Sequence, residues 1–471
     1  MPAATTFFWH DYETFGRVPR RDRPAQFAGL RTDAELNPIG EPVNWLCRPT
    51  VDAPLPDPEA VLLTGITPQQ ALEQGLAEPE FAARIEAELA REGTVGVGYN
   101  SIRFDDEVTR HLFWRNLIDP YAREWKNGCG RWDLLDLVRC CWALRPEGIE
   151  WPLGDDGKPS FRLEALTAAN GLAHEAAHDA LSDVRATLAL ARLVKARQPR
   201  LWTFGLELRS KAGVWDEIGV NRPFVHLSGR YPVERGCLAI VWPLAAHPVN
   251  RNELIVWDLA HDPSELAGID ADEARRRLFT RSDELEEQGG ARLPIKTVHV
   301  NKSPIVIGNL AVLGAARERF GIDVDLALRH AAQAQRLPNL DALWSALFAR
   351  PAADGPVDVD EDLYGGFVSD ADRRTLDRLR ALPPEQLATR RVAFDDARLD
   401  ELLFRYRARH FPHTLDAEEQ QRWQAHRRQR LSGAVLAAYH ERIDALAEAA
   451  DERGQALLEA LVDYAEGVAP D

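Results

Sequence analysis

The chain has 471 residues, of which 45% are hydrophobic and 28% charged, and its formal net charge at pH 7 is −17. This length predicts two or three domains with sizeable cores, and the acidic balance argues against a generic nucleic-acid coat, although salt screening leaves room for a local basic groove. No apolar run is long enough for a membrane span and the N-terminus lacks a signal-peptide pattern, so we expect a cytoplasmic protein.

The cysteines favour neither a disulfide framework nor a structural zinc site. They are five in number, two of them are adjacent, and none belongs to a C-x-x-C pair. We therefore expect reduced and mostly buried thiols, at Cys47, Cys129, Cys140, Cys141 and Cys237.

Residues 1–198 alternate strand-like and helix-like segments, which predicts an α/β domain with a mixed sheet. Three aromatic residues stand in succession at positions 7–9, as in a central strand that is buried on both faces. Residues 79–92 have the apolar spacing of a helix, and a short strand at 93–100 precedes further helices.

The pattern changes near position 199. Residues 199–350 hold short β-rich runs separated by Pro, Gly and Asn, with helix-like pieces among them, and predict a second domain of mixed α+β type. Residues 351–362 are acidic and contain Pro and Gly, as a linker does. Residues 363–471 predict a helical C-terminal domain, in which Asp416 and Glu419 form a capping box.

Two carboxylates, Asp11 and Glu13, follow the aromatic run. Side chains two apart on a strand share one face, so these like charges would lie side by side at the end of a buried strand. Divalent cations between the pair and a phosphate substrate would make this arrangement tolerable, as in two-metal sites with ions roughly 3.5–4 Å apart. In a chain with 74 acidic residues such a pair often arises by chance, so for the pair taken alone a solvated strand end is the favoured explanation.

Asp105 is a third acidic candidate. It follows Phe104 near the start of an expected helix, so Phe104 can anchor in the core while Asp105 faces outward from the first turn. The alternative is that Asp105, with Asp106 and Glu107, only interacts favourably with the helix dipole.

His178 and Asp183 complete the set. Five helical steps do not place two residues on one stripe, so His178 must sit at or just before the start of the helix that carries Asp183. A histidine there can take a proton from metal-bound water near neutral pH. A helix-capping or surface histidine is the alternative.

These signals in this order resemble the DEDD exonuclease superfamily, and the histidine five residues before the last aspartate matches its DEDDh branch. Residues 62–71, "LLTGITPQQA", resemble the T-G-I-T turn that presents backbone groups to the terminal nucleotide. Segments such as "GYNSIRFDDEVTRHLFWRN", "RWDLLDLVR" and "LLFRYRARHFP" further resemble the bacterial exodeoxyribonuclease I family, and such segments span nearly the whole chain.

The resemblance implies a three-domain monomer: a ribonuclease H-like exonuclease domain, an α+β SH3-like domain and an all-α C-terminal domain that together enclose single-stranded DNA. It implies processive 3′→5′ hydrolysis to nucleoside 5′-monophosphates in DNA repair and recombination. The implied cofactor is Mg²⁺, two ions per site, with Mn²⁺ as a substitute. The implied partner is the acidic C-terminal tail of single-strand DNA-binding protein.

The same resemblance implies roles for single residues. Asp11, Glu13 and Asp183 would ligate metal, with Glu13 also touching substrate, and Asp105 would complete the acidic set. His178 would be the general base, and Arg162 would contact the substrate.

Processive enzymes also hold the strand away from the reacting phosphate, with cationic grooves and aromatic platforms. Positions that match DNA contacts of the family are Arg110, Tyr121, Trp125 and Arg139, although aromatic residues are also ordinary core anchors. Candidates for backbone contacts in the second domain are Lys211, Asn252, Lys296 and Asn301. The Arg-rich and aromatic residues at 405–430 could face DNA, face a partner, or pair with nearby glutamates.

Two other functions stay open. A 3′→5′ exoribonuclease of the same superfamily would share the site, but such chains are typically much shorter. A non-catalytic single-strand-binding scaffold would share the enclosure, but its acidic set would be eroded, whereas every position of the motif is filled here.

Overall fold

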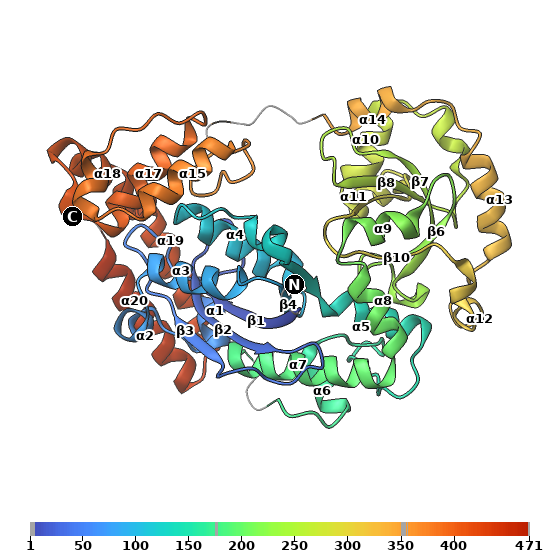
Figure 1. The fold of residues 1–471 in the computed structure, drawn as a ribbon, viewed down its shortest axis with the longest axis horizontal. Helices are drawn as coiled ribbons and strands as arrows, with labels where there is room; N and C mark the ends of the chain where they lie inside the picture. Colours follow the sequence, from blue (N-terminus) through green and yellow to red (C-terminus); the bar gives the residue numbers. More distant parts are fainter. Residues whose placement is uncertain (1–4, 175–177, 350–354, 356, 470–471) are drawn as a thin grey trace. The chain divides into compact units, whose positions relative to one another are not determined.

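The computed structural model describes residues 5–174, 178–349, 355 and 357–469 (Figure 1). The chain divides into two compact units. The first unit comprises Met1–Gly130, His174–Leu188 and Asp354–Asp471, and the second comprises Arg131–Ala173 and Ala189–Ala353. Among the described residues, no helix has both the length and the apolar character needed to cross a membrane.

A five-stranded mixed sheet has the strand order β3-β2-β1-β4-β5, and its first four strands in this order belong to the first unit. The central strand β1 pairs antiparallel with β2 and parallel with β4, and its residues Phe7, Phe8 and Trp9 are buried, as the sequence predicts. The strands are β1 (Thr6–Thr14), β2 (Pro24–Thr32), β3 (Val43–Leu46), β4 (Thr94–Gly98) and β5 (Gly130–Asp133).

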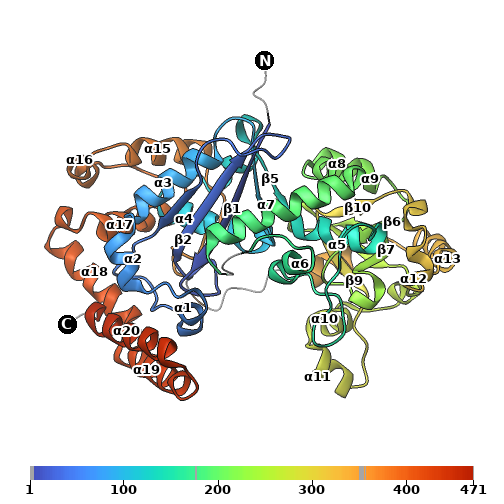
Figure 2. The same cartoon turned by 90° about the horizontal axis from the view of Figure 1, so that it is seen from below.

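Helices surround this sheet and form most of the chain after position 357 (Figures 1 and 2). The helices of the first unit are α1 (Pro58–Thr64), α2 (Pro68–Gln74), α3 (Glu78–Leu89), α4 (Asp105–Arg115), the start of α7 (Ala180–Arg197), α15 (Asp370–Arg380), α16 (Pro384–Thr389), α17 (Arg398–His410), α18 (Ala417–Arg430), α19 (Gly433–Ala447) and α20 (Glu452–Val468). Its 3₁₀ turns are η1 (Ser101–Arg103), η2 (Ala122–Glu124), η3 (Lys126–Gly128) and η7 (Pro412–Thr414).

The C-terminal helices confirm the predicted helical region and add one break. The capping box of Asp416 and Glu419 is present at the start of α18. The last apolar stretch divides into α19 and α20, because Asp451 caps a new helix by accepting a hydrogen bond from the Gly454 amide.

Helix α20 packs against α1 and α2, which lie on either side of the T-G-I-T turn, and α19 packs against α20 (Figures 1 and 2). Tyr439, Ile443 and Leu461 share an apolar cluster with Val61 and Ile66 of this segment. The Tyr439 hydroxyl donates a hydrogen bond of 2.8 Å to the Pro56 carbonyl. The C-terminal helices therefore pack against the segment that carries the turn and stabilise it.

Several arginines at 405–430 form ion pairs with acidic residues of the first unit. Arg405 pairs with Glu401, Arg407 with Glu419, and Arg430 with Asp358. Of the three alternatives that the sequence left open, these contacts favour pairing with nearby acidic groups.

A buried ion network joins the C-terminal helices to the sheet-bearing part of the first unit. Arg409 donates to both oxygens of Asp52 at 2.7–3.1 Å and to Asp360 at 2.5 Å, and all three side chains are at most 1% exposed. Asp360 lies in the predicted linker 351–362, of which residues 351–354 and 356 lie outside the described part of the chain.

The second unit has its own antiparallel sheet, in the order β10-β6-β7-β8-β9, and it confirms the predicted α+β type. Its strands are β6 (Phe224–Leu227), β7 (Leu238–Ala246), β8 (Glu253–Asp258), β9 (Ile295–His299) and β10 (Ile305–Ile307). Its helices are α5 (Leu134–Leu144), α6 (Leu163–Ala169), the end of α7, α8 (Pro199–Glu207), α9 (Lys211–Ile218), α10 (Ala271–Phe279), α11 (Ser282–Glu287), α12 (Ala316–Arg319), α13 (Val324–Ala334) and α14 (Asp341–Leu347), with 3₁₀ turns η4 (Val233–Arg235), η5 (Pro263–Ala267) and η6 (Leu310–Leu313).

The five cysteines are free and buried, which confirms the expectation of reduced thiols. Burial raises the pKa of Cys140 to about 12 and that of Cys237 above its usual value. These thiols therefore stay protonated at neutral pH and act as small apolar side chains.

Candidate active site

The second half of β1 carries Asp11 and Glu13 on one face of the sheet. Between them, Tyr12 points to the opposite face and packs on Phe27, with the ring centroids 4.7 Å apart. Asp11 is half-buried and Glu13 is 9% exposed. The alternation of the strand thus anchors Tyr12 in the core and holds both carboxylates on the other side.

Asp105 joins this pair from the first turn of α4. The Tyr12 amide donates a hydrogen bond of 3.0 Å to the Asp105 carboxylate, which is 4% exposed. The Thr109 hydroxyl, one turn later on α4, donates to the Tyr12 hydroxyl at 3.0 Å. Asp105 therefore binds the strand between the two carboxylates, which goes beyond a favourable interaction with the helix dipole.

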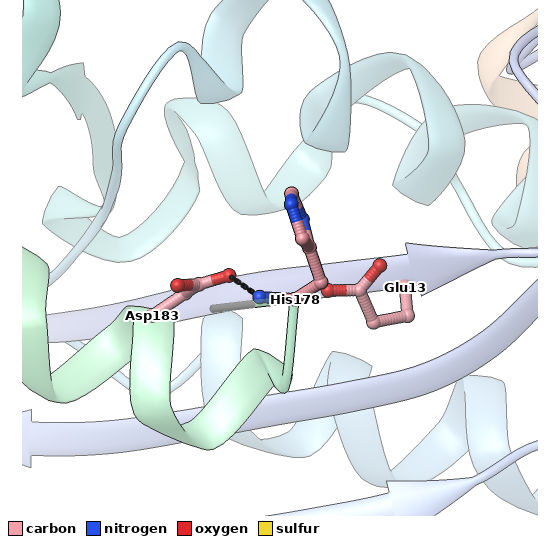
Figure 3. A group of neighbouring side chains, drawn as sticks. All are labelled: Glu13, His178 and Asp183. Carbon is pink, nitrogen blue, oxygen red and sulfur yellow. Dashed lines mark hydrogen bonds between the residues drawn. The ribbon is translucent and has the colours of Figure 1, made fainter. Parts of the chain in front are cut away.

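His178 lies just before α7, as its spacing from Asp183 predicts, and Asp183 lies in the first turn of this helix. The Asp183 carboxylate accepts a hydrogen bond of 3.3 Å from the His178 amide. Figure 3 shows the Glu13 carboxylate directed toward His178, with the dashed line joining Asp183 to the main chain of that residue. His178 has a φ of +65°, a left-handed conformation that is uncommon outside glycine.

His174, which the sequence pattern did not single out, also contacts this group. Its Nε2 lies 2.5 Å from the second carboxylate oxygen of Asp183. A signal was present in "AHEAAH", where His174 and His178 stand four residues apart directly before the helix. Residues 175–177 between them lie outside the described part of the chain.

Burial and mutual repulsion dominate the electrostatics of the site. Burial, with Asp183 and Asp105 nearby, raises the pKa of Glu13 to about 8. Burial, Asp105, Glu13 and Asp183 together raise the pKa of Asp11 well above its usual range. The pKa of Asp183 is also raised by burial, although His174 and His178 act in the opposite direction.

These shifts show that the four carboxyl groups are close enough to interact strongly. Ligand atoms of Glu13, His178 and Asp183 lie within 4.8 Å of one another, a spacing at which they could share a metal ion. Clustered carboxylate oxygens of this kind are the ligands that a hard divalent cation such as Mg²⁺ or Mn²⁺ prefers. The ligand role of each residue, Asp11 included, stays a prediction.

A cavity of about 540 Å³ opens beside the acidic group. Its lining includes residues 64–66 of the T-G-I-T turn and, from the segment before α7, His178 and Asp179. The remaining lining residues are Gln26, Asn44, Trp45, Leu46, Gln70, Gln74 and Leu76. The predicted base and the turn predicted to present backbone to a nucleotide therefore face one space.

The predicted DNA contacts of the first unit differ in how exposed they are. Trp125 is 67% exposed, which suits a stacking platform better than a core anchor. Arg110 is 4% exposed, and its guanidinium is bonded to Glu107 and Glu124 and lies 5.3 Å from the Tyr121 ring centroid. Because its charge is already balanced, Arg110 is suited to orienting Tyr121.

Tyr364 is a further neighbour of Arg110, and the sequence pattern did not indicate it. Its hydroxyl accepts a hydrogen bond of 3.1 Å from Arg110 and donates one to Glu107, and half of the residue is exposed. Only the folded chain reveals this neighbour, because Tyr364 and Arg110 are 254 residues apart.

The predicted DNA contacts of the second unit differ in whether their side chains are exposed or are bonded to other protein groups. Arg162 is exposed directly before α6, whereas Arg139 is bonded to Asp136 at 2.6 Å. Lys211 donates to Asn252 at 2.6 Å, so these two candidates form one polar pair.

Lys296 and Asn301 are the remaining candidates of the second unit. Lys296 lies 3.4 Å from the Tyr231 ring centroid, and burial lowers its pKa to about 7. The Asn301 carbonyl accepts a hydrogen bond from Arg131 at 3.1 Å. Their DNA-binding roles, like those of the other candidates, stay predictions.

Comparison with known protein families matches three models along the chain. An exonuclease model matches residues 8–191, an exonuclease I SH3-like domain matches 209–350, and an exonuclease I C-terminal domain matches 357–468. The three matches follow one another in the order that the sequence analysis expects.

The chain is similar over nearly its whole length to exodeoxyribonuclease I of two bacteria. It is 49% identical to the Haemophilus influenzae protein, with 92% of each chain covered, and 47% identical to the Escherichia coli protein, with 98% of each covered. The structure also resembles E. coli exonuclease I in complex with a dA16 oligonucleotide, with a TM-score of 0.94 at 47% identity, covering 98% of this chain and 100% of that one.

Two further structures of similar proteins bear on ligands. A zinc-bound E. coli exonuclease I–single-stranded DNA complex has a TM-score of 0.92 at 46% identity, covering 98% of this chain and 99% of that one. A structure of SSB and exonuclease I with an inhibitor has a TM-score of 0.91 at 45% identity, covering 99% and 100%.

Proposed function

The chain belongs to the exodeoxyribonuclease I family, and from this premise we propose that it removes nucleotides from the 3′ ends of single-stranded DNA. The proposed reaction is processive hydrolysis of phosphodiesters to nucleoside 5′-monophosphates, with Mg²⁺ as the physiological metal. The observation that carries the proposal is the convergence of carboxylates from β1, α4 and α7, together with His178, beside one cavity.

In the proposed mechanism, Asp11, Glu13 and Asp183 would hold the divalent ions. Bound ions of this kind lower the pKa of a water ligand and stabilise negative charge on the reacting phosphate. The His178 ring accepts the proton of the attacking water, and the cavity beside the T-G-I-T turn holds the terminal nucleotide. Asp105 keeps β1 in place through the Tyr12 amide.

We infer a division into an exonuclease domain at 1–198, an SH3-like domain at 199–350, a linker at 351–362 and a helical domain at 363–471. The ranges of the three family matches support this division. We further propose a cytoplasmic monomer that acts in DNA repair and recombination. Its proposed partner is the acidic C-terminal tail of single-strand DNA-binding protein, supported by the SSB-containing structure of a similar protein.

The function is tested with 5′-labelled single-stranded DNA, duplex DNA and RNA, each with Mg²⁺ or with EDTA. We expect rapid shortening of single-stranded DNA alone, only with metal, and none by Asp183→Ala. The His178→Ala variant should cleave about 10²–10⁴-fold more slowly, the usual contribution of a positioned general base, with unchanged DNA affinity. Equal attack on RNA would indicate an exoribonuclease, and tight binding without cleavage would indicate a scaffold.

A further inference from the structure

Gln26 is a buried polar residue of β2 that the catalytic assignment does not use. It is 6% exposed and stands directly across from Glu13 in the β1–β2 register. Directly opposite residues of an antiparallel pair share one face, so the Gln26 amide lies on the same side of the sheet as the carboxylates. It also lines the cavity that contains His178.

The amide of Gln26 contacts the start of α7 through both of its polar atoms. Its oxygen accepts a hydrogen bond of 3.3 Å from the amide of Ala180, the first residue of the helix. Its nitrogen donates to Asp179 at 3.4 Å and to Asn44 of β3 at 2.9 Å. The other oxygen of Asp179 accepts from the Ser182 amide at 2.9 Å and so caps the helix.

His178 therefore precedes two residues that are both bonded to one glutamine. Its own left-handed backbone conformation is unfavourable for a side-chain-bearing residue and persists only where the surroundings enforce it. The contacts of Ala180 and Asp179 with Gln26 supply that constraint from the sheet, where the acidic residues Asp11 and Glu13 also reside.

We propose that Gln26 is a positioning residue, which docks the first turn of α7 on β2 and thereby fixes His178 relative to the metal-binding carboxylates. This inference rests on the proposed function, in which His178 is the base. A glutamine is suited to the task because one neutral side chain both donates and accepts, without adding charge to an already acidic site. Misplacing a reacting group by about 1 Å can cost about 10²-fold in rate.

The test compares Gln26→Met, which keeps the length of the side chain and removes its polar atoms, with the same change at Gln420. The Gln420 amide bonds to the Leu415 carbonyl in the C-terminal helices and so controls for loss of a glutamine hydrogen bond. We expect Gln26→Met to lower kcat for single-stranded DNA by about 10²-fold with KM changed less than about twofold. Gln420→Met should retain the wild-type kcat.

A double mutant separates positioning from a general loss of structure. If Gln26 acts through His178, adding Gln26→Met to His178→Ala should slow cleavage by less than about threefold more, because the group to be positioned is absent. A further loss of about 10²-fold in the double mutant would overturn the proposal. So would an unchanged kcat of Gln26→Met in an active enzyme, whereas an inactive wild-type protein would refute the proposed function itself. If Gln26→Met does not fold, Gln26→Glu replaces it in the test. This variant keeps the side-chain volume and opposes Asp179 with a like charge, so we expect the same fall in kcat with little change in KM.

Discussion

The first unit contains two groups of buried carboxylates whose pKa values are shifted in opposite directions. At the candidate active site, Asp11 and Glu13 face further carboxylates, and burial and repulsion raise their pKa values. In the network around Arg409, burial would raise the pKa of Asp52 and Asp360 as well, but Arg409 and Arg23 lower the first well below its usual range and the second to about 2.

The difference separates a structural from a functional use of buried charge. Carboxylates that are paired with arginine inside the protein join segments that are far apart in the chain, and they need nothing from solution. Carboxylates that repel one another lower the stability of the protein, and such repulsion is typical of sites that bind a ligand. Each group can therefore be altered with a distinct expected result.

The largest effect on stability is expected from Arg409→Met. This change leaves Asp52 and Asp360 buried without their main cation, and breaking a buried pair in this way typically costs about 3–5 kcal/mol. We expect the free energy of unfolding in urea to fall by that amount at pH 7. The control is Arg422→Met, because Arg422 pairs with Glu401 on the surface and is 55% exposed. A loss below about 1 kcal/mol for Arg409→Met would show that the network is not what joins these segments.

The pH dependence should have opposite signs for the two groups. The folded Glu13 carboxyl keeps its proton up to about pH 8, whereas the unfolded one loses it near pH 4.5, so the folded state binds more protons in between. The free energy of unfolding of the metal-free protein should therefore fall by a few kcal/mol as pH rises through this window, since one pKa unit corresponds to about 1.4 kcal/mol. Stability from Asp360 is present above about pH 4 and is lost only as pH falls toward 2.

Urea unfolding between pH 5 and 8, with EDTA or with Mg²⁺, measures this effect of Glu13. Metal at 100 times its dissociation constant should restore about 2.7 kcal/mol, and more effectively at pH 8 than at pH 5, because binding displaces protons. A metal-free protein whose stability is constant from pH 5 to 8 would contradict the repulsion among the carboxylates.

The two groups also differ in how far the sequence could predict them. The aromatic run, the D-x-E pair and the five-residue spacing of His178 and Asp183 are local patterns, and the structure places these segments as the patterns predict. The pairing of Arg409 with Asp52 joins residues 357 apart, and Gln26 reaches Ala180 of α7 across 154 positions. Contacts of this kind depend on how elements pack, and neither residue type nor local spacing identifies them.

A single substitution at the active site should separate catalysis from stability. Glu13→Gln removes one of the repelling charges, so we expect the metal-free protein to gain a few kcal/mol at pH 8, the amount that ionisation of Glu13 costs there, while exonuclease activity is lost. Glu41→Gln, at an exposed position, should change neither quantity. Loss of stability in Glu13→Gln would indicate a favourable partner for this carboxylate.

The smallest effect on stability is expected from an exposed ion pair that joins α19 to the start of α1. Arg442 of α19 bonds to Asp57 and Glu59 at the start of α1, and its side chain is 47% exposed. Exposed pairs are screened by salt and contribute about 0.2–1 kcal/mol, so Arg442→Met should cost no more than this in urea unfolding, with most of the loss removed by 1 M salt. A salt-independent loss of 3 kcal/mol would mean that the ion pairs of Arg442, and not the apolar cluster of Tyr439 and Ile443, hold α19 and α20 against the segment that carries the T-G-I-T turn. In that case the contrast between buried and exposed ion pairs would not apply to this interface, and the support of the cavity wall would depend on ionic strength.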